Sequence, residues 1–293
     1  MAENESRFNI QWYPGHMTKT RRQMEQDIKL VDLVAEIIDA RIPISSRNPD
    51  IDGIVKDKPR LIVLNRVDQA DPEQTKRWAA FFKQQGCSVL ETDAKTGKGV
   101  NRFSAVVRES LAEQIAKWKE KGQVGRPVRA MVVGVPNVGK STFINHVAKR
   151  KSAKAGDRPG VTRGKQWVAV DSSLDLLDTP GILWPKFEDE QTGLHLAFTG
   201  AVKAEIMDLE TLAHYLMELL KRRYPDALRQ RYGIEVPEDA KGWVLVEAAA
   251  RKRGFLISGG EVDLERMSRI LLDEFRSGKL GNFTLETVED LTP

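Results

Sequence analysis

The sequence predicts an α/β domain, in which helices cover a mostly parallel sheet, followed by an all-helical domain. Short apolar runs alternate with amphipathic stretches up to about residue 190, as strands alternate with crossover helices. A phosphate-loop pattern, GVPNVGKS at 134–141, stands between a strand-like run and a helix-like run. Beyond about residue 190 only helical periodicity continues. We therefore expect one domain at 1–190 and a second, helical domain at 191–293.

Composition agrees with two soluble domains. The chain has 293 residues, of which 41% are hydrophobic and 30% are charged, and this length is enough for two cores. Apolar runs stay well below the roughly 18 residues that a membrane span needs, and the chain begins with a polar stretch. The single cysteine, Cys87, excludes an internal disulfide. We expect a cytoplasmic protein that has no membrane partner.

Six apolar segments are predicted as strands. Each is short, rich in aliphatic residues and bounded by a turn or a polar loop. They lie at 31–40, 60–65, 87–94, 128–135, 167–170 and 174–181. The last two are so close in the chain that we expect them to be neighbouring strands.

Helices are predicted between these strands and through the C-terminal part. Asp71 can cap a helix that runs to about residue 86, and Pro72 suits its first turn. Another helix is predicted across 101–122, where a glycine ends the pattern. The remaining amphipathic segments lie at 140–150, 208–223, 242–254 and 263–280.

The charge of the chain is unevenly distributed. The net charge is +4, but residues 200–293 contain 14 Lys and Arg against 17 Asp and Glu, a net of −3 that leaves +7 for the rest. Two tight basic clusters, at 19–22 and 149–154, lie in the positive part. Such clusters are either solvated helix faces or a footprint for a polyanion, of which nucleic acid is the commonest in the cytoplasm.

The phosphate loop is the strongest single motif. Its glycines, Gly134 and Gly139, let the backbone N–H groups curl around phosphate oxygens, and the dipole of the following helix assists. Lys140 is expected to reach the β- and γ-phosphates, and Ser141 to ligate Mg²⁺. The expected nucleotide contacts of this loop are Asn137, Val138, Gly139, Lys140, Ser141 and Thr142.

A second motif, DTPG at 178–181, suits the metal and the terminal phosphate. Asp178 follows an apolar strand and can hold a water of Mg²⁺, while the Gly181 N–H can meet the γ-phosphate. Thr162, in RPGVTRG, would supply a second hydroxyl ligand to Mg²⁺, although alone it would be interpreted as a turn threonine. Together with the phosphate loop, these residues predict a nucleoside triphosphatase.

Two further loops suit the guanine base. NRVD at 65–68 follows a strand, so Asn65 and Asp68 emerge at its end, and the Asp68 carboxylate can accept from the N1 and N2 donors of guanine. Arg66 stands where lysine is usual, and its aliphatic stem can cover the base. TDAKTGKG at 92–99 would bring the Ala94 N–H to guanine O6 and Lys95 over the base, with Asp93 where serine is usual.

The base motifs precede the phosphate loop, which reverses their usual order. Loops at the carboxyl ends of parallel strands meet at one edge whatever the point at which the chain begins. The order therefore predicts a circularly permuted P-loop domain that binds guanine nucleotides. Two alternatives stay open: an ATPase or kinase, which has no use for Asp68, and an RNA-binding module in which GTP only fixes a shape.

Further motifs extend along the chain. They are QWYPGHM at 11–17, Asp39-Ala40-Arg41 followed by Pro43, and FRSGKLG at 275–281. Together with NRVD, GVPNVGKS, PGVTRG and DTPGILWPK they resemble the circularly permuted GTPases of the YlqF/YawG group over nearly the whole chain. The resemblance implies a GTPase that binds GTP and GDP with Mg²⁺. It also implies action on a late large-ribosomal-subunit precursor, contact with rRNA, stimulation by ribosomal particles and departure on hydrolysis. We expect a monomer and no DNA partner.

The resemblance also implies a source for the catalytic group. Ras-like enzymes use a glutamine directly after D-x-x-G to position the attacking water, whereas Ile182 stands here. The resemblance fills this role with His16 of YPGHM, so that the catalytic set becomes His16, Lys140 and Thr162. It also implies that Asn137 coordinates K⁺, a cation that could replace an arginine finger. Considered alone, His16 would be interpreted as a packed or capping histidine; Ile182 and the family motif favour the catalytic role.

Overall fold

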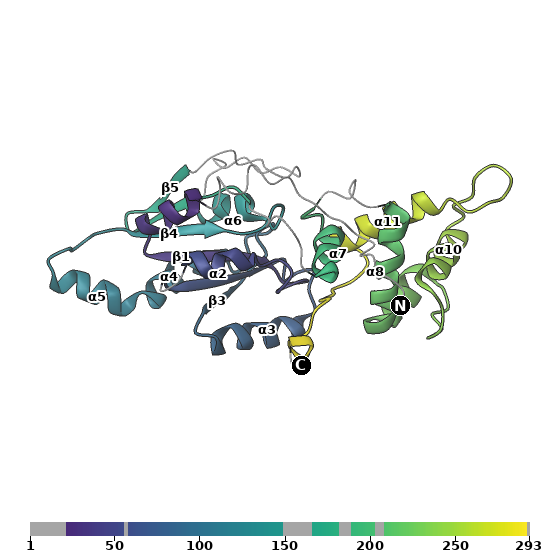
Figure 1. Ribbon diagram of the computed structural model, residues 1–293, viewed down its shortest axis with the longest axis horizontal. Helices are drawn as coiled ribbons and strands as arrows, with labels where there is room; N and C mark the ends of the chain where they lie inside the picture. Colours follow the sequence, from purple (N-terminus) through teal and green to yellow (C-terminus); the bar gives the residue numbers. More distant parts are fainter. Residues whose placement is uncertain (1–21, 56–57, 149–165, 182–188, 203–207, 292–293) are drawn as a thin grey trace, which may run out of the picture. The chain divides into compact units, whose positions relative to one another are not determined.

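The computed structural model describes residues 22–55, 58–148, 166–181, 189–202 and 208–291. Contacts divide the chain into two units. Among the described residues, 22–181 and 286–291 belong to one unit and 189–285 to the other. Figure 1 shows the sheet of the first unit and the helices of the second.

The first unit is built on a six-stranded sheet with the order β3-β2-β1-β4-β6-β5. All neighbouring pairs are parallel except β5 with β6, which is antiparallel. The strands are β1 (Leu33–Asp39), β2 (Arg60–Asn65), β3 (Ser88–Glu91), β4 (Val128–Val133), β5 (Gln166–Asp171) and β6 (Leu174–Asp178). All six predicted strands are therefore confirmed, including the neighbouring pair β5 and β6. The central strands are almost wholly buried, which explains why they are continuous apolar runs.

Strand register brings the functional loops to one edge. Asp39 at the end of β1 pairs with Asn65 at the end of β2. Asp178 at the end of β6 pairs with Val132, just before the phosphate loop. The carboxyl ends of these strands therefore lie together, even though the strand that leads into the phosphate loop is fourth along the chain.

The helices of this unit pack on the sheet through apolar side chains. The cluster around Val34 includes residues of α2 (Pro49–Val55), and the cluster around Ile38 includes Trp78 and Phe82 of α3 (Pro72–Gln84). Because Val34 and Ile38 lie four residues apart on a strand, α2 and α3 cover the same face. The remaining helical elements of the unit are η1 (Ile28–Leu30), η2 (Val100–Arg102), α4 (Phe103–Ser110), α5 (Ala112–Glu120), α6 (Lys140–Val147) and η4 (Val288–Leu291).

One helix prediction is confirmed in detail and another needs correction. Asp71 caps α3, and its Oδ1 accepts from the backbone N–H groups of Glu73 (2.8 Å) and Gln74 (3.2 Å). The single helix predicted across 101–122 is instead divided at Leu111, whose φ of −113° and ψ of 14° leave the helical region. Leu111 is buried, whereas α5 buries none of its residues, so the break falls where contact with the core ends. In Figure 1, α5 extends beyond the sheet.

The second unit is all-helical. Its elements are α7 (Glu190–Thr199), α8 (Leu209–Arg223), α9 (Pro225–Tyr232), α10 (Gly242–Lys252) and α11 (Leu264–Ser277). α8 packs against both α10 and α11, and its buried residues Leu212, Leu216 and Leu220 recur every four positions, as one helix face requires. None of the helices among the described residues is both long and apolar enough to cross a membrane.

The chain returns to the first unit after α11. Glu286 begins the returning segment, and its carbonyl oxygen accepts from Trp78 Nε1 at 3.1 Å. Glu289 forms an ion pair with Arg77 at 2.8 Å, and Val288 packs against the α3 cluster. The sequence assigns every residue after 190 to the helical domain, so this return differs from the expected boundaries.

Candidate functional site

The phosphate loop between β4 and α6 depends on two glycines. Gly139 has a φ of 98° and precedes the first turn of α6. A Cβ at Gly139 would overlap the side-chain nitrogen of Asn65, and a Cβ at Gly134 would lie 2.6 Å from the Ile37 carbonyl oxygen. These positions therefore exclude side chains, which lets Asn65 and the Ile37 carbonyl approach the backbone of the phosphate loop closely.

Lys140 and Asp178 form a buried ion pair at the centre of this edge. Lys140 Nζ lies 3.0 Å from Asp178 Oδ1, and the two side chains are only 6% and 2% exposed. Nearby, a Cβ at Gly181 would lie 3.0 Å from backbone atoms of Pro136, so the DTPG turn packs directly on the phosphate loop. The hydroxyl of Thr179 donates to the Val132 carbonyl (2.8 Å) and fixes the same turn. The two phosphate-binding motifs thus form one site.

Asn65 connects the phosphate loop with the base loop. Its Nδ2 donates to the Val138 carbonyl oxygen (2.8 Å), and its Oδ1 accepts from the Ala94 N–H (2.9 Å). The Thr92 hydroxyl also donates to Oδ1, at 3.2 Å. Asn65 is buried, so it acts as an internal brace between loops that are distant in sequence. The Ala94 N–H, which the sequence assigns to guanine O6, donates to Asn65 in this structure.

Arg66 also contacts the phosphate loop. Its backbone is in the left-handed region, with a φ of 62°, and its Nη2 donates to the Asn137 carbonyl oxygen at 2.9 Å. Its Nε lies 3.6 Å from Asp39 Oδ2. The Arg66 guanidinium thus contacts two partners at once, through different nitrogens. A lysine at this position would have one ammonium group and would direct such contacts less precisely.

Two carboxylates, Asp68 and Asp93, border the base loops and titrate differently. Desolvation, followed by the negative charge of Asp93, raises the pKa of Asp68 above its ordinary value. Desolvation acts to raise the pKa of Asp93 too, but hydrogen bonds from Thr96 and from the Lys95 N–H outweigh it, so this pKa is lowered. Asp93 therefore shapes the loop that carries Lys95, and the exposed Asp68 keeps its carboxylate at the surface of the site.

Comparison with known proteins agrees with this arrangement. A family model described as "50S ribosome-binding GTPase" matches residues 129–224. The GDP-bound structure of TM YlqF is 30% identical, with a TM-score of 0.65, and the match covers 92% of this chain and 100% of that chain. The GNP-bound crystal structure of YlqF from T. maritima is 31% identical, with a TM-score of 0.62, and the match covers 92% and 98%. Ribosome biogenesis GTPase A of Bacillus cereus is 48% identical over 282 residues, 96% of this chain and 95% of that protein.

The chain belongs to the ribosome biogenesis GTPase A family. The predicted circularly permuted P-loop GTPase fold and the resemblance to the YlqF group are thereby confirmed. As a member of the ribosome biogenesis GTPase A family, the chain is a GTP hydrolase. This assignment removes the ATPase and kinase alternatives.

The donors at the phosphate edge fit the Mg²⁺ on which GTPases depend. Ser141 is the second residue of α6 and offers a hydroxyl, and Asp178 offers a carboxylate at the end of β6. Hydroxyl and carboxylate oxygens are the ligands that Mg²⁺ prefers. Thr142 follows on the same helical turn, and Asn137, the expected K⁺ ligand, has a left-handed φ of 58° within the loop.

Other assignments fall outside the described residues. His16 and Thr162, the expected catalytic histidine and second metal ligand, both lie there, as does Ile182. Their roles stay predictions. For the other predicted residues, the structure brings the phosphate loop, the DTPG turn and the two base loops together at one edge of the sheet.

Sequence reasoning gave no role to Asp39 and Arg41 beyond their place in a family motif. The structure shows both side chains buried, with Arg41 Nε and Nη2 donating to Asp39 at 2.9 and 2.7 Å. The position of Asp39 at a strand end, level with Asn65, was the available signal. No feature of the sequence around Arg66 indicated its contact with the phosphate loop.

Proposed function

We propose that this GTPase binds a late precursor of the large ribosomal subunit through rRNA, hydrolyses GTP there and leaves as a result. One observation carries the proposal: similarity to ribosome biogenesis GTPase A extends over 96% of the chain. It therefore includes the helical unit as well as the nucleotide site. The family model described as "50S ribosome-binding GTPase" supports the same partner.

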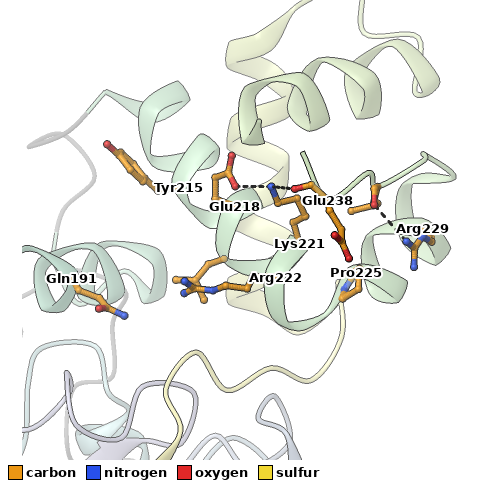
Figure 2. A pocket seen from close by; sticks show the side chains of 10 residues that line it. Gln191, Tyr215, Glu218, Lys221, Arg222, Pro225, Arg229 and Glu238 are labelled. Atoms are coloured by element: carbon orange, nitrogen blue, oxygen red, sulfur yellow. Dashed lines mark hydrogen bonds and ion pairs between the residues drawn. The ribbon is translucent and has the colours of Figure 1, made fainter. Parts of the chain in front are cut away.

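Residues 200–293 are net negative as a whole, so bulk charge does not attract rRNA to the helical unit. Local basic residues must then make the contacts. A pocket of about 640 Å³ lies on this unit beside the end of α8. Figure 2 shows Lys221 joined to neighbouring groups of the pocket wall; its Nζ donates to the carbonyls of Glu238 (3.0 Å) and Ala240 (2.7 Å). The exposed Arg222 also lines the pocket, on the side of Gln191. We infer that Arg222, not Lys221, contacts a backbone phosphate.

Residues 251–253 form another basic group on the helical unit, and its members differ in the same way as Lys221 and Arg222. Arg251 is paired with Glu247 at 2.7 Å. Arg253 is paired with Glu274 at 3.1 Å and lies over the ring of Tyr232, 4.9 Å from its centroid. Lys252 is exposed at the end of α10. Lys252 is therefore the cation of this cluster that we assign to rRNA.

At the nucleotide site, each residue has a distinct proposed role. When GTP binds, the Lys140 ammonium leaves Asp178 and pairs with the β- and γ-phosphates. The N–H groups at the start of α6 donate to oxygens of the same phosphates. Ser141, Thr162 and Asp178 would hold Mg²⁺, which would supply positive charge against the phosphates. Asp68 accepts from the N1 and N2 donors of guanine, which sets base specificity.

Hydrolysis needs a group that orients the attacking water. His16 fills this role in our proposal, and Asn137 would hold K⁺, which would supply positive charge to the transition state. We further propose that the protein is cytoplasmic and monomeric. Light scattering would test the monomeric state, and cell fractionation the location.

Sedimentation with ribosomal particles tests the proposed partner. Purified protein is mixed with late large-subunit precursors and with mature subunits, in the presence of GTP, GDP or a non-hydrolysable GTP analogue. We expect co-sedimentation with the precursor in the analogue, loss of binding after GTP hydrolysis, and faster turnover when precursors are present. Equal binding in all nucleotide states would contradict the proposal. Nucleotide-dependent binding with no stimulation of turnover would also contradict it, and would favour an RNA-binding module in which GTP only fixes a shape.

A further inference from the structure

The carboxylate of Glu286 is bound inside the GTPase unit. It accepts from the backbone N–H of Ile44 at 2.6 Å and from that of Ser45 at 3.0 Å. The Ser45 hydroxyl donates to the same carboxylate. Glu286 is only 8% exposed. A buried carboxylate that receives several donors from one turn holds that turn firmly, because each is a charge-assisted bond.

The turn that Glu286 holds leads back to the end of β1. Ser46 follows the two donor residues, and its hydroxyl oxygen accepts from the Asp39 N–H at 2.9 Å. The same hydroxyl donates to the Ile42 carbonyl at 2.7 Å, which closes the turn on itself. The backbone of Asp39 is therefore fixed from the side on which Glu286 is bound.

Asp39 in turn faces two arginines. Its carboxylate accepts from Arg41 Nε and Nη2, and it lies 3.6 Å from Arg66 Nε. Desolvation acts to raise the pKa of Asp39, but the charge and hydrogen bonds of Arg41, together with the charge of Arg66, outweigh it and the pKa is lowered, so this carboxylate is ionised at neutral pH. The far end of the Arg66 guanidinium donates to the Asn137 carbonyl of the phosphate loop at 2.9 Å.

These contacts form one continuous series from the end of the chain to the nucleotide site. We propose that Glu286 is a positioning residue for GTP: it holds the Ile44–Ser45 turn, which fixes Asp39, which orients Arg66 against the phosphate loop. The inference rests on the GTPase assignment and goes beyond it, because it gives the returning C-terminal segment a part in nucleotide binding. Glu286 touches no reacting group, so its effect is on loop geometry.

Nucleotide affinity of the full chain tests the proposal. Glu286→Ala removes both carboxylate oxygens, and Glu286→Gln keeps one side-chain carbonyl oxygen but turns its amide N–H₂ toward a donor. Fluorescent GDP and GTP analogues give dissociation constants, and steady-state assays give KM and kcat. We expect affinity to fall roughly tenfold in Glu286→Ala and less in Glu286→Gln, on the scale of a lost charge-assisted bond, with kcat nearly unchanged.

Two controls separate positioning from simple docking of the segment. Glu289→Ala removes the exposed pair with Arg77 in the same segment, and it should leave nucleotide affinity at the wild-type value. In an Arg66→Ala background, Glu286→Ala should have little further effect, because both act through one series of contacts.

The possible results separate a positioning role of Glu286 from a purely structural one. Wild-type affinity in folded Glu286→Gln and Glu286→Ala, or effects of Glu286 and Arg66 that simply add, would overturn the positioning role while leaving the GTPase assignment intact. If Glu286→Ala does not fold, Ser45→Ala provides a second test. It removes the hydroxyl that donates to the Glu286 carboxylate, and it must also lower nucleotide affinity. A loss of melting temperature without a change in affinity would show that Glu286 only anchors the segment.

Discussion

Replacing Asn65 by alanine should separate the two loops that form the nucleotide site. The change removes three hydrogen bonds, to the Val138 carbonyl, the Ala94 N–H and the Thr92 hydroxyl. Two buried backbone groups then lose their partner, and each such loss costs about 1–3 kcal/mol. We expect the free energy of unfolding to fall by roughly 2–4 kcal/mol, after allowance for partial relaxation. Urea denaturation measures this change, and nucleotide titration should show an affinity at least about tenfold weaker.

A second buried asparagine provides the matched control. Asn48 is as buried as Asn65, but its side chain accepts from the Asp50 N–H at the start of α2. Asn48→Ala should therefore lower stability by about 1 kcal/mol, as the loss of a helix cap does, and leave nucleotide affinity unchanged. If Asn65→Ala destabilised the protein no more than Asn48→Ala, or bound GTP normally, the role of Asn65 as a brace between the loops would be refuted.

Three further predictions concern the base, the catalytic step and the RNA surface. Asp68→Asn should weaken GTP binding roughly tenfold or more and should bind xanthosine triphosphate. Only the ionised form of Asp68 accepts from both base donors, and the pKa of Asp68 is raised. The GTP affinity of the wild-type protein should therefore decline on acidification at a higher pH than an ordinary aspartate would give. Titrations across pH with both nucleotides check this, and equal GTP affinity in the variant contradicts it. His16→Ala should keep GTP affinity but slow particle-stimulated hydrolysis on the order of 10²–10⁴-fold, and a wild-type rate on the particle would assign the water to another group. Combined Arg222→Glu and Lys252→Glu should weaken precursor binding and flatten its salt dependence, whereas charge reversal at the paired Arg269 should not.

Much of the GTPase unit could be predicted from local sequence. The strands are short apolar runs, and α3 begins with an aspartate and a proline whose backbone preferences act within one turn. The meeting of Asn65 with the phosphate loop follows from parallel strands that end at the same edge. These features depend on neighbours or on sheet topology, and both leave a pattern in the chain.

Contacts that depend on distant residues left no such pattern. Glu286 binds a turn more than two hundred residues away, and nothing in the sequence around it distinguishes it from a solvated glutamate. The division of the predicted helix at Leu111 depends on where the core ends, which the amphipathic pattern did not reveal. The contact of Arg66 with Asn137 requires a left-handed backbone at a residue that rarely adopts it.

The buried pair of Lys140 and Asp178 bears on nucleotide exchange. An isolated ammonium or carboxylate at such depth would cost several kcal/mol, and that cost would oppose departure of the phosphates. Because each charge has a partner within the chain, at 3.0 Å, release of the nucleotide replaces one ion pair with another. The cost of leaving either charge unpaired therefore does not oppose departure of the phosphates.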